Sequence, residues 1–485
     1  MGVQRRWRRT RLGLAAAVAA TAPLLLGSAA ADPAVSGPVT GGNGRVLLQA
    51  TTFPLDSVGY TQSEFFVSGT ASSFAPVTDL GTDGRWQVSP ATTAPFTTRI
   101  VVNRPADSAR FNGTVVVEWL NVSAGLDVAP DWIYSHNELI REGFAWVGVS
   151  AQAAGVSADK AGDPARYATL SHPGDSYSYD IFSQAGRAVR SSAATVLGGL
   201  RPRAVLAEGE SQSAFRLTTY LNAVQPLAHE YDGFLVHSRG GDSAPLSQAP
   251  QVDVPTPQVV RFRTDLDVPV LAVQTETDLM LLGYLAARQD DSPRVRIWEV
   301  AGTAHADAYI ATLGAGDDGG GETGVRELAA MLDPPVGTPG FTCDKPINTG
   351  QGHYVVDAAQ YALNRWVTAG VPPARAARLQ VDTSGPAPVF VLDTHGNAKG
   401  GVRTPAVDVP VATLSGLGQA GSSFCFLFGT TTPFGTTTLT ALYPTHAHFV
   451  ARWTAGTTSA VAAGFLRPAD GIELVRAAVA TGVGG

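Results

Sequence analysis

The stretch RAVLAEGESQSAFRLTTYLNAV, residues 203–224, predicts a strand, a sharp turn and a helix in succession. Residues 204–207 form an apolar run that is typical of a buried strand. The turn reads Gly-Glu-Ser-Gln-Ser over residues 209–213. After it, apolar side chains recur at roughly helical spacing, at Phe215, Leu217, Tyr220 and Leu221. The turn resembles the pattern G-x-S-x-G, in which a strained strand-to-helix turn exposes a serine, but Ser213 replaces the last glycine.

Further apolar runs on both sides of this turn predict the rest of a sheet. They cover residues 113–122, 144–152, 231–238, 268–275 and 294–302. Helix-like segments lie between some of them, for example at 136–143 and 177–200. Near-continuous apolar strands that alternate with helices are typical of a mostly parallel sheet covered on both faces. We therefore expect an α/β fold with its core over residues 111–370.

Polar residues follow the later strands in the order that an acyl-transfer serine requires. In hydrolases with this turn the serine comes first along the chain, then Asp or Glu, then His, each after a strand. Glu276 and Asp278 follow the strand at 268–275, and His305 follows the strand that begins at 294. We predict Ser211 as the nucleophile, His305 as the base and Asp278 as the acid. Glu276 remains the alternative acid, because it lies nearer the strand end.

The same mechanism needs backbone N–H groups that stabilise the negative oxygen formed during acyl transfer. The N–H of Gln212, the residue after the nucleophile, is the first predicted donor. The second is expected in the loop after the strand at 113–122, where Asn121 and Val122 come first. The predicted reaction has two steps, in which an acyl-enzyme forms on Ser211 and water then releases it.

Three segments outside this pattern differ in composition. Residues 32–110 are rich in Thr, Val, Ser, Pro and Gly and predict a β-rich segment of short antiparallel strands. Residues 239–267 contain four prolines and predict an insertion above the sheet edge. Residues 371–485 have strand and turn composition, and we expect a β/loop extension packed on the core. The glycine-rich acidic run at 313–324 lacks EF-hand spacing and favours a surface loop.

The first 31 residues are typical of a secretory signal peptide, with five arginines before residue 12, an apolar run and a small-residue run ending at Ala31. Arg8-Arg9 leaves twin-arginine export open beside the Sec route. Cleavage after Ala31 changes the formal net charge from −7 to −12. An acidic exported chain without a basic patch argues against nucleic-acid partners, and no later segment predicts stable membrane insertion.

The chain has two cysteines, Cys343 and Cys425, and both lie after the predicted cleavage point. In an exported protein such a pair favours one disulfide. Neither cysteine has a Cys or His neighbour at metal-ligand spacing, so a structural zinc is not predicted. The His-x-His pair of His446 and His448 supports a metal only weakly. No cofactor and no metal are expected.

Several runs together resemble the bacterial α/β-hydrolase domain family, whose members are mostly uncharacterised predicted esterases. They are VVVEWLNVSAGLDVAPDW, EGESQSA, VLAVQTETDL, WEVAGTAHAD, PINTGQGHYVVDAAQYALNRWV and GGVRTPAVDVP. The resemblance covers nearly the whole chain after residue 31. It implies an α/β-hydrolase fold and a serine hydrolase mechanism that uses Ser211, His305 and either Asp278 or Glu276. It implies no particular substrate.

The expected function is a secreted carboxylic ester hydrolase that acts on a small-molecule or polymeric ester. A lactonase or a polyester-degrading enzyme would use the same three residues and differ in pocket shape. A non-catalytic binding module on a hydrolase scaffold is the alternative from a different class. The presence of serine, acid and histidine in the required order argues against that alternative.

Overall fold

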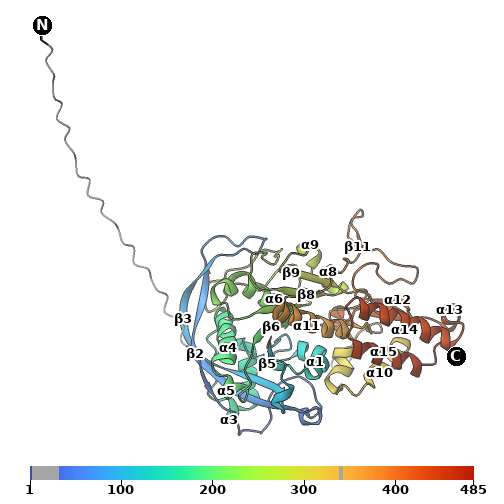
Figure 1. Cartoon of the computed structure of the whole chain (residues 1–485), viewed down its shortest axis with the longest axis horizontal. Coiled ribbons are helices and arrows are strands. Elements are labelled where there is room, and N and C mark those ends of the chain that lie inside the picture. The colour runs from blue at the N-terminus through green and yellow to red at the C-terminus, as the bar shows by residue number, and fades with distance from the viewer. Residues whose placement is uncertain (3–31, 338–341) are drawn as a thin grey trace. The chain divides into compact units, whose positions relative to one another are not determined.

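One nine-stranded sheet organises the part of the computed structural model that is described, residues 1–2, 32–337 and 342–485 (Figure 1). The strand order is β1-β2-β3-β5-β4-β6-β7-β8-β9, with antiparallel pairs from β1 to β5 and parallel pairs from β5 to β9. The expected mostly parallel α/β sheet is therefore confirmed. The strands are β1 Ala34–Ser36, β2 Tyr60–Pro76, β3 Val88–Pro105, β4 Thr114–Trp119, β5 Ala145–Val149, β6 Ala204–Glu210, β7 Gly233–His237, β8 Val270–Gln274 and β9 Val295–Glu299.

The parallel strands are buried on both faces. Every residue of β4 to β9 is buried, which explains why their sequences are apolar runs rather than alternating patterns. Successive residues of β4 point to opposite faces, so Val115 and Val117 belong to one hydrophobic cluster and Val116 to another. Helices α4 and α6 contribute to the first cluster, and α1 and α11 to the second.

The helices that accompany this sheet follow or connect its strands. They are α1 Pro130–Glu142, α2 Ala153–Gly162, α3 Pro164–Tyr167, α4 Ser178–Ser191, α5 Ala193–Val196, α6 Gln212–Thr219, α7 Gln225–Ala228, α8 Glu276–Met280, α9 Tyr284–Ala287, α10 Thr323–Leu332 and α11 Gly352–Ala369. Helix α6 directly follows β6, and α8 begins two residues after β8. The strand ends that carry the predicted site residues therefore lead into helices or tight loops.

The N-terminal segment is β-rich, but its strands are longer than the sequence predicted. β2 has 17 residues and β3 has 18, and they pair from Tyr60–Pro105 to Pro76–Val88 around one irregularity between Ser72 and Phe74. Pro90 and Pro95 lie within β3. They are accommodated because β5 pairs with β3 only over residues 100–103, so this part of β3 has a neighbour on one side alone.

Residues 239–267 contain no helix or strand, as their prolines predicted; all of them are described. Arg239 is buried at the start of this segment and its guanidinium reaches into the later part. It donates to the carbonyl oxygens of Val260 and Gly241 and lies over the Phe262 ring at 4.7 Å. The buried guanidinium of Arg239 thus holds this irregular segment together. Backbone carbonyl oxygens and the Phe262 ring surround it.

The extension at 371–485 differs from the β/loop prediction in its last 50 residues. Its first part holds β10 Val381–Asp382, β11 Val389–Phe390, α12 Pro405–Asp408, β12 Ala412–Ser415 and β13 Thr430–Pro433. The rest is helical, with α13 Thr436–Leu442, α14 His446–Ala462 and α15 Pro468–Ala480, and Figure 1 shows α12, α14 and α15 near α10. The strand and turn composition of the whole extension did not reveal this part, in which Phe449, Trp453 and Thr457 are buried at four-residue helical spacing.

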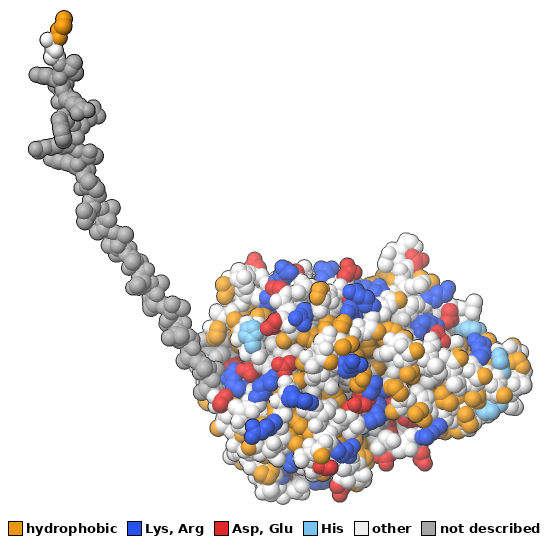
Figure 2. All heavy atoms as spheres, viewed as in Figure 1, with side chains coloured by type: hydrophobic (Ala, Val, Ile, Leu, Met, Phe, Trp, Pro, Cys, Tyr) orange, Lys and Arg blue, Asp and Glu red, His pale blue; other side chains and the backbone are white. Residues whose placement is uncertain are grey.

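A disulfide joins Cys343 and Cys425, as the cysteine pair predicted. Residues 32–485 form one compact unit. The predicted signal peptide at 1–31 lies outside the described residues, apart from residues 1 and 2. In the described ranges, no helix combines the length and the apolar character that a membrane crossing requires. On the face in Figure 2, positive and negative side chains are interspersed.

Candidate active site

Ser211 lies in the turn between β6 and α6 with a strained backbone. Its φ is 56° and its ψ is −122°, a region that residues other than glycine rarely adopt. A Cβ at Gly209 would lie 3.1 Å from the Ser213 carbonyl carbon and oxygen, a tight contact with backbone that has to shift slightly to accept it. Ser213 itself is the second residue of α6 and is fully buried. The turn therefore favours glycine at 209 and accommodates serine at 213.

A continuous hydrogen-bond chain links Ser211 to Asp278 through His305. Ser211 Oγ lies 2.7 Å from His305 Nε2, and His305 Nδ1 lies 2.7 Å from Asp278 Oδ1. Asp278 Oδ2 accepts the N–H of Thr275 at 2.6 Å, and Asp278 is fully buried. With a proton on Nδ1 donated to Asp278, Nε2 is free to accept the serine proton. This geometry suits a serine nucleophile with an oriented base.

Glu276, the alternative acid, is hydrogen-bonded to the backbone of two other loops. Its Oε1 accepts the N–H of Gly302 at 2.6 Å, and its Oε2 accepts the N–H of Gly416 at 2.9 Å. The two acidic residues diverge because both lie in the first turn of α8, where Asp278 folds back to the N–H of Thr275 in a capping box. The structure brings Asp278, and not Glu276, to the histidine ring.

The protonation of His305 reflects two opposing effects. Burial lowers its pKa, while the hydrogen bond and the charge of Asp278 raise it, and the net shift is upward. Glu210 adds a second carboxyl group, with Oε1 3.5 Å from His305 Nε2. Burial raises the pKa of Glu210 to about 8. Sequence reasoning assigned Glu210 no role, although its position directly before the nucleophile was a signal that could have indicated one.

The predicted oxyanion donors Gln212, Asn121 and Val122 differ in the hydrogen bonds of their backbone N–H groups. Gln212 is the first residue of α6, where a backbone N–H has no acceptor within the helix. Asn121 does not fit the prediction, because its N–H donates to Val128 O at 2.9 Å in an isolated bridge. Its side chain instead donates to the Glu210 carbonyl oxygen at 3.2 Å. Val122 is left as the candidate for the second donor.

A further pair of polar side chains lies beside these residues. His237, at the end of β7, has Nδ1 2.8 Å from Asp131 Oδ1 near the start of α1. The carbonyl oxygen of His237 accepts the N–H of Ser211 at 3.0 Å, so the end of β7 also fixes the nucleophile. The position of His237 after a strand suggests a residue that lines the pocket, but no sequence pattern pairs it with Asp131, because the two are 106 positions apart.

The possible metal-binding patterns in the sequence have other partners. His446 lies 3.0 Å from Val483 O and 3.3 Å from Val479 O, so its ring joins the ends of α14 and α15. In the run at 313–324, the Asp317 carboxylate accepts Asn137 Nδ2 at 2.7 Å and the Tyr309 hydroxyl at 3.1 Å. Across the described residues, no group of three or more His, Cys, Asp or Glu side chains is arranged to hold a metal ion.

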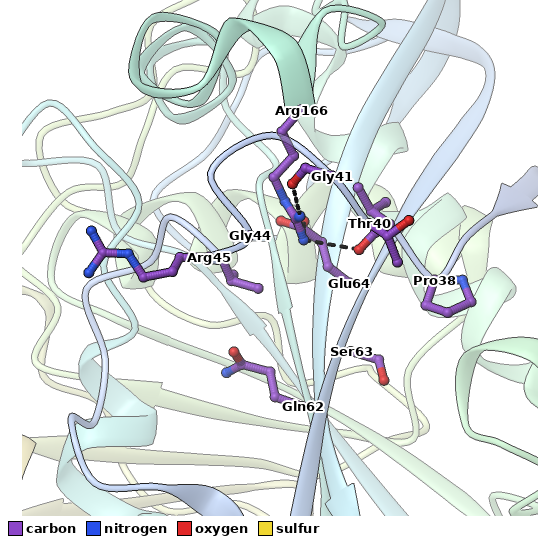
Figure 3. Close-up of a pocket in the computed structure, with 11 residues that line it drawn as sticks. Pro38, Thr40, Gly41, Gly44, Arg45, Gln62, Ser63, Glu64 and Arg166 are labelled. Atoms are coloured by element: carbon purple, nitrogen blue, oxygen red, sulfur yellow. Dashed lines mark hydrogen bonds and ion pairs between the residues drawn. The ribbon is translucent and has the colours of Figure 1, made fainter.

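A hollow of about 690 Å³ lies in the N-terminal segment, away from Ser211 and His305 (Figure 3). Arg166 reaches into it, with its Nε 2.7 Å from Glu64 Oε2. The same guanidinium donates to Gly41 O at 3.0 Å and to Val39 O at 3.1 Å. Through these bonds Arg166 holds the loop around Gly41 against Glu64.

The fold and the serine turn place the chain among known hydrolases. The model of the family described as "Alpha/beta hydrolase domain" matches residues 35–476. The chain belongs to this family. In this α/β-hydrolase Ser211 lies in the turn after β6, Asp278 in α8 after β8, and His305 in the loop after β9, the order that the sequence predicted. No curated protein sequence matches this α/β-hydrolase significantly.

Solved structures with a similar fold are distant in sequence. XC6422 from Xanthomonas campestris, a lidless serine hydrolase, is 12% identical with a TM-score of 0.26, and the match covers 47% of this α/β-hydrolase and 83% of that chain. The rice cell wall degrading esterase LipA from Xanthomonas oryzae is 14% identical with a TM-score of 0.24, covering 39% and 48%. A glucuronoyl esterase from Solibacter usitatus is 9% identical with a TM-score of 0.27, covering 50% and 76%. We infer no substrate from these likenesses.

Proposed function

We propose that this chain is an exported serine hydrolase that cleaves carboxylic esters, with Ser211 as nucleophile, His305 as base and Asp278 as acid. The observation that carries the proposal is the hydrogen-bond chain from a strained serine to a buried aspartate, with 2.7 Å at each histidine nitrogen. A strained serine at a strand-to-helix turn with such partners is the arrangement that acyl transfer requires.

In the first step, His305 Nε2 takes the hydroxyl proton of Ser211 while Oγ attacks the ester carbonyl carbon. The carbonyl oxygen becomes negative, and the N–H groups of Gln212 and Val122 stabilise it in our proposal. The protonated imidazole then gives its proton to the leaving alcohol, and the acyl-enzyme on Ser211 remains. Asp278 holds Nδ1 and stabilises the imidazolium during this step.

In the second step, water replaces the alcohol. His305 Nε2 removes one proton from the water, and the resulting hydroxide oxygen attacks the acyl carbon. When the tetrahedral intermediate collapses, the proton returns to Ser211 Oγ and the carboxylic acid leaves. The balance is one ester and one water consumed, with one acid and one alcohol released.

A lactone or a polyester would pass through the same steps, because each contains the same acyl–oxygen bond. A lactone would release its alcohol and its acid as one molecule. Residues 239–267 have no regular structure, and we expect this segment and the extension to influence which esters bind. The substrate is proposed here only as a class, a small-molecule or polymeric ester.

Export is part of the proposal for two reasons. The first 31 residues have signal-peptide composition, and the disulfide between Cys343 and Cys425 is a bond that oxidising compartments favour. Expression with an intact N-terminus, followed by N-terminal sequencing of the protein in the medium, would test this. We expect the mature chain to begin at Asp32.

A fluorophosphonate probe tests the catalytic assignment, since it reacts covalently only with an activated serine. We expect the wild type to be labelled and Ser211→Ala to be unlabelled. Ser213→Ala is the matched control, because Ser213 lies two residues away in the same turn, and we expect it to be labelled like the wild type. An unlabelled wild type, or equal labelling of Ser211→Ala, would overturn the proposal and favour a non-catalytic binding module.

Substrate class is tested with p-nitrophenyl esters of increasing chain length and with a lactone. We expect hydrolysis of at least one ester by the wild type. Loss of that hydrolysis in Ser211→Ala by a factor of about 10⁴ or more would match removal of a nucleophile. Hydrolysis of lactones alone would replace the ester assignment with the lactonase assignment.

A further inference from the structure

Glu276 occupies a position that neither the acid role nor ordinary surface placement explains. It lies two residues before Asp278, it is 1% exposed, and both of its carboxylate oxygens are used. One accepts the N–H of Gly302, three residues before His305, and the other accepts the N–H of Gly416 in the extension. A single buried carboxylate therefore ties together the loop of the acid, the loop of the base and a segment 140 residues later in the chain.

Gly416 lies directly between the two catalytic loops. A Cβ on it would be 2.6 Å from the Cβ of Glu276 and from the N of Thr277, and 2.7 Å from the O of Thr303. Thr277 adds a second link, because its hydroxyl donates to Gly416 O at 2.7 Å and accepts the N–H of His305 at 3.2 Å. The Thr277 hydroxyl thus links the carbonyl oxygen of Gly416 to the backbone N–H of His305.

Two more contacts bring the same part of the extension to the histidine loop. Asn348 Nδ2 donates to Gly302 O and to Ser415 O, each at 3.1 Å. The N–H of Ala306, next to the base, donates to Leu427 O at 3.1 Å. Cys425, two residues before Leu427, forms the disulfide with Cys343. The two cysteines pack in one cluster with Ala306 and Ala308. Residues 415–429 therefore brace the loop that carries His305.

We propose that Glu276 is a positioning residue and that residues 415–429 of the extension are part of the catalytic apparatus. This inference rests on the proposed function. Its physical basis is that both hydrogen bonds of His305 are short, and a displacement of about 1 Å in such a site costs up to about 100-fold in rate. Glu276 and Thr277 fix the two loops whose separation sets the His305–Asp278 bond.

The test is Glu276→Gln, which keeps the shape of the side chain but leaves one oxygen. The amide nitrogen then faces a backbone N–H, so one of the two ties is lost. We expect kcat for a p-nitrophenyl ester to fall by about 10- to 100-fold with KM changed less than about twofold. Fluorophosphonate labelling of Ser211 should slow in the same proportion.

The pH profile separates positioning from general destabilisation. The Asp278 hydrogen bond raises the pKa of His305, so a loosened His305–Asp278 pair should move the acid limb of kcat/KM to lower pH. The other titratable groups facing His305, namely Glu210 and His237, are unchanged in the variant. Burial raises the pKa of Glu276 itself to about 7, so Thr277→Val, which keeps Glu276, is the variant whose acid limb reports on His305 alone. A variant that is merely less stable would lose active protein without moving this limb.

Asp163→Asn is the matched control. Asp163 is a buried carboxylate that also accepts two backbone N–H groups, those of Asn43 at 2.6 Å and Arg166 at 3.1 Å. Its bonds hold the N-terminal segment and α3 rather than the loops of Asp278 and His305. We expect Asp163→Asn to lower the melting temperature without moving the acid limb.

Thr277 provides a second pair of variants in case Glu276→Gln fails to fold. Thr277→Val removes the hydroxyl that joins Gly416 to His305, and Thr277→Ser keeps it. We expect Thr277→Val to lose kcat and to move the acid limb, and Thr277→Ser to recover both. Wild-type labelling together with unchanged kcat and acid limb in Glu276→Gln and Thr277→Val would overturn this inference alone. A wild type that is neither labelled nor active would instead overturn the proposed function.

Discussion

The two halves of the candidate active site are built in different ways. The nucleophile half lies within one strand–turn–helix unit, where β6, Ser211 and α6 are consecutive in the chain. The half that holds Asp278 and His305 draws on separate segments, including Asn348 and residues 415–429. A short sequence motif can therefore identify the nucleophile. The positions of the base and the acid depend instead on contacts between segments that are far apart in the chain.

The largest effect is expected from Asp278→Asn, which tests the assembled half. The amide keeps the shape of the side chain but removes the charge that stabilises the imidazolium, so kcat should fall by about 10³- to 10⁴-fold. The acid limb of kcat/KM should move to lower pH, because Asp278 raises the pKa of His305. Steady-state kinetics over a range of ~4 pH units around the ordinary histidine pKa measure the fall in kcat and the position of the acid limb. A larger loss in Glu276→Gln than in Asp278→Asn would reverse the assignment of the acid.

The double variant Cys343→Ser/Cys425→Ser should come next. The two cysteines are 82 residues apart, and opening such a loop costs about 4 kcal/mol of unfolding free energy. Because the pair packs against Ala306 and Ala308 beside the base, fluorophosphonate labelling under native conditions should also slow. Denaturant titration and labelling rates measure the two effects. An unchanged labelling rate in the folded variant would show that the disulfide stabilises the chain without bracing the base.

Glu210→Gln probes the point where the halves meet, since Glu210 belongs to the serine turn and faces His305. Its pKa is raised from 4.5 to about 8 because it is buried, so the folded protein holds a proton that the unfolded chain releases in this window. Stability from this group is therefore complete below pH 4.5 and is lost as the pH rises through about 8. We expect the wild-type melting temperature to fall across this window and the Glu210→Gln curve to be flatter.

The same variant should also change the alkaline side of the activity profile. Ionised Glu210 competes with Ser211 for His305 Nε2, which lies 3.5 Å from Glu210 Oε1, so wild-type kcat/KM should decline above about pH 8. Glu210→Gln should retain activity there, with a difference of about tenfold, the equivalent of one pKa unit. Glu322→Gln is the control, because Glu322 is exposed and lies on α10's N-terminal side. Identical curves for Glu210→Gln and the wild type would contradict this prediction.

The smallest effect is expected from Ser213→Gly, which restores the glycine of the usual motif. Glycine in a helix costs some stability, but the substitution also removes a buried hydroxyl that has no hydrogen-bond partner among the described residues. The net change in unfolding free energy should be within about 1 kcal/mol, with kcat/KM within about twofold. Gly209→Ala is the contrast, because its Cβ would meet the Ser213 backbone at 3.1 Å. A large gain in activity for Ser213→Gly would show that the turn of this chain is impaired.

The sequence predicted most of the sheet and the loops that bring Ser211, Asp278 and His305 together, because buried parallel strands leave a clear apolar pattern. It left the choice between Asp278 and Glu276 open, since both follow the same strand and only the capping geometry of α8 separates them. It proposed Asn121 as an oxyanion donor, because no sequence pattern indicates the bridge to Val128 within the same loop that occupies the N–H of Asn121.

Two larger differences have similar causes. Helices α14 and α15 were missed because the extension was predicted from its overall strand and turn composition, although Phe449 and Trp453 carry a helical spacing. β2 and β3 were predicted as short strands because the segment is rich in proline and glycine, but prolines are tolerated where a strand has a neighbour on one side only. In both cases local composition indicated one structure and packing against the rest of the chain determined another.

The position of Gly416 between the two catalytic loops also sets an order for the synthesis of the protein. The serine turn has all of its residues once about the first half of the chain exists. The support beneath His305 arrives only when residues 415–429 have been made. A growing chain therefore carries Ser211, Asp278 and His305 before it has the segment that braces the loop of the base.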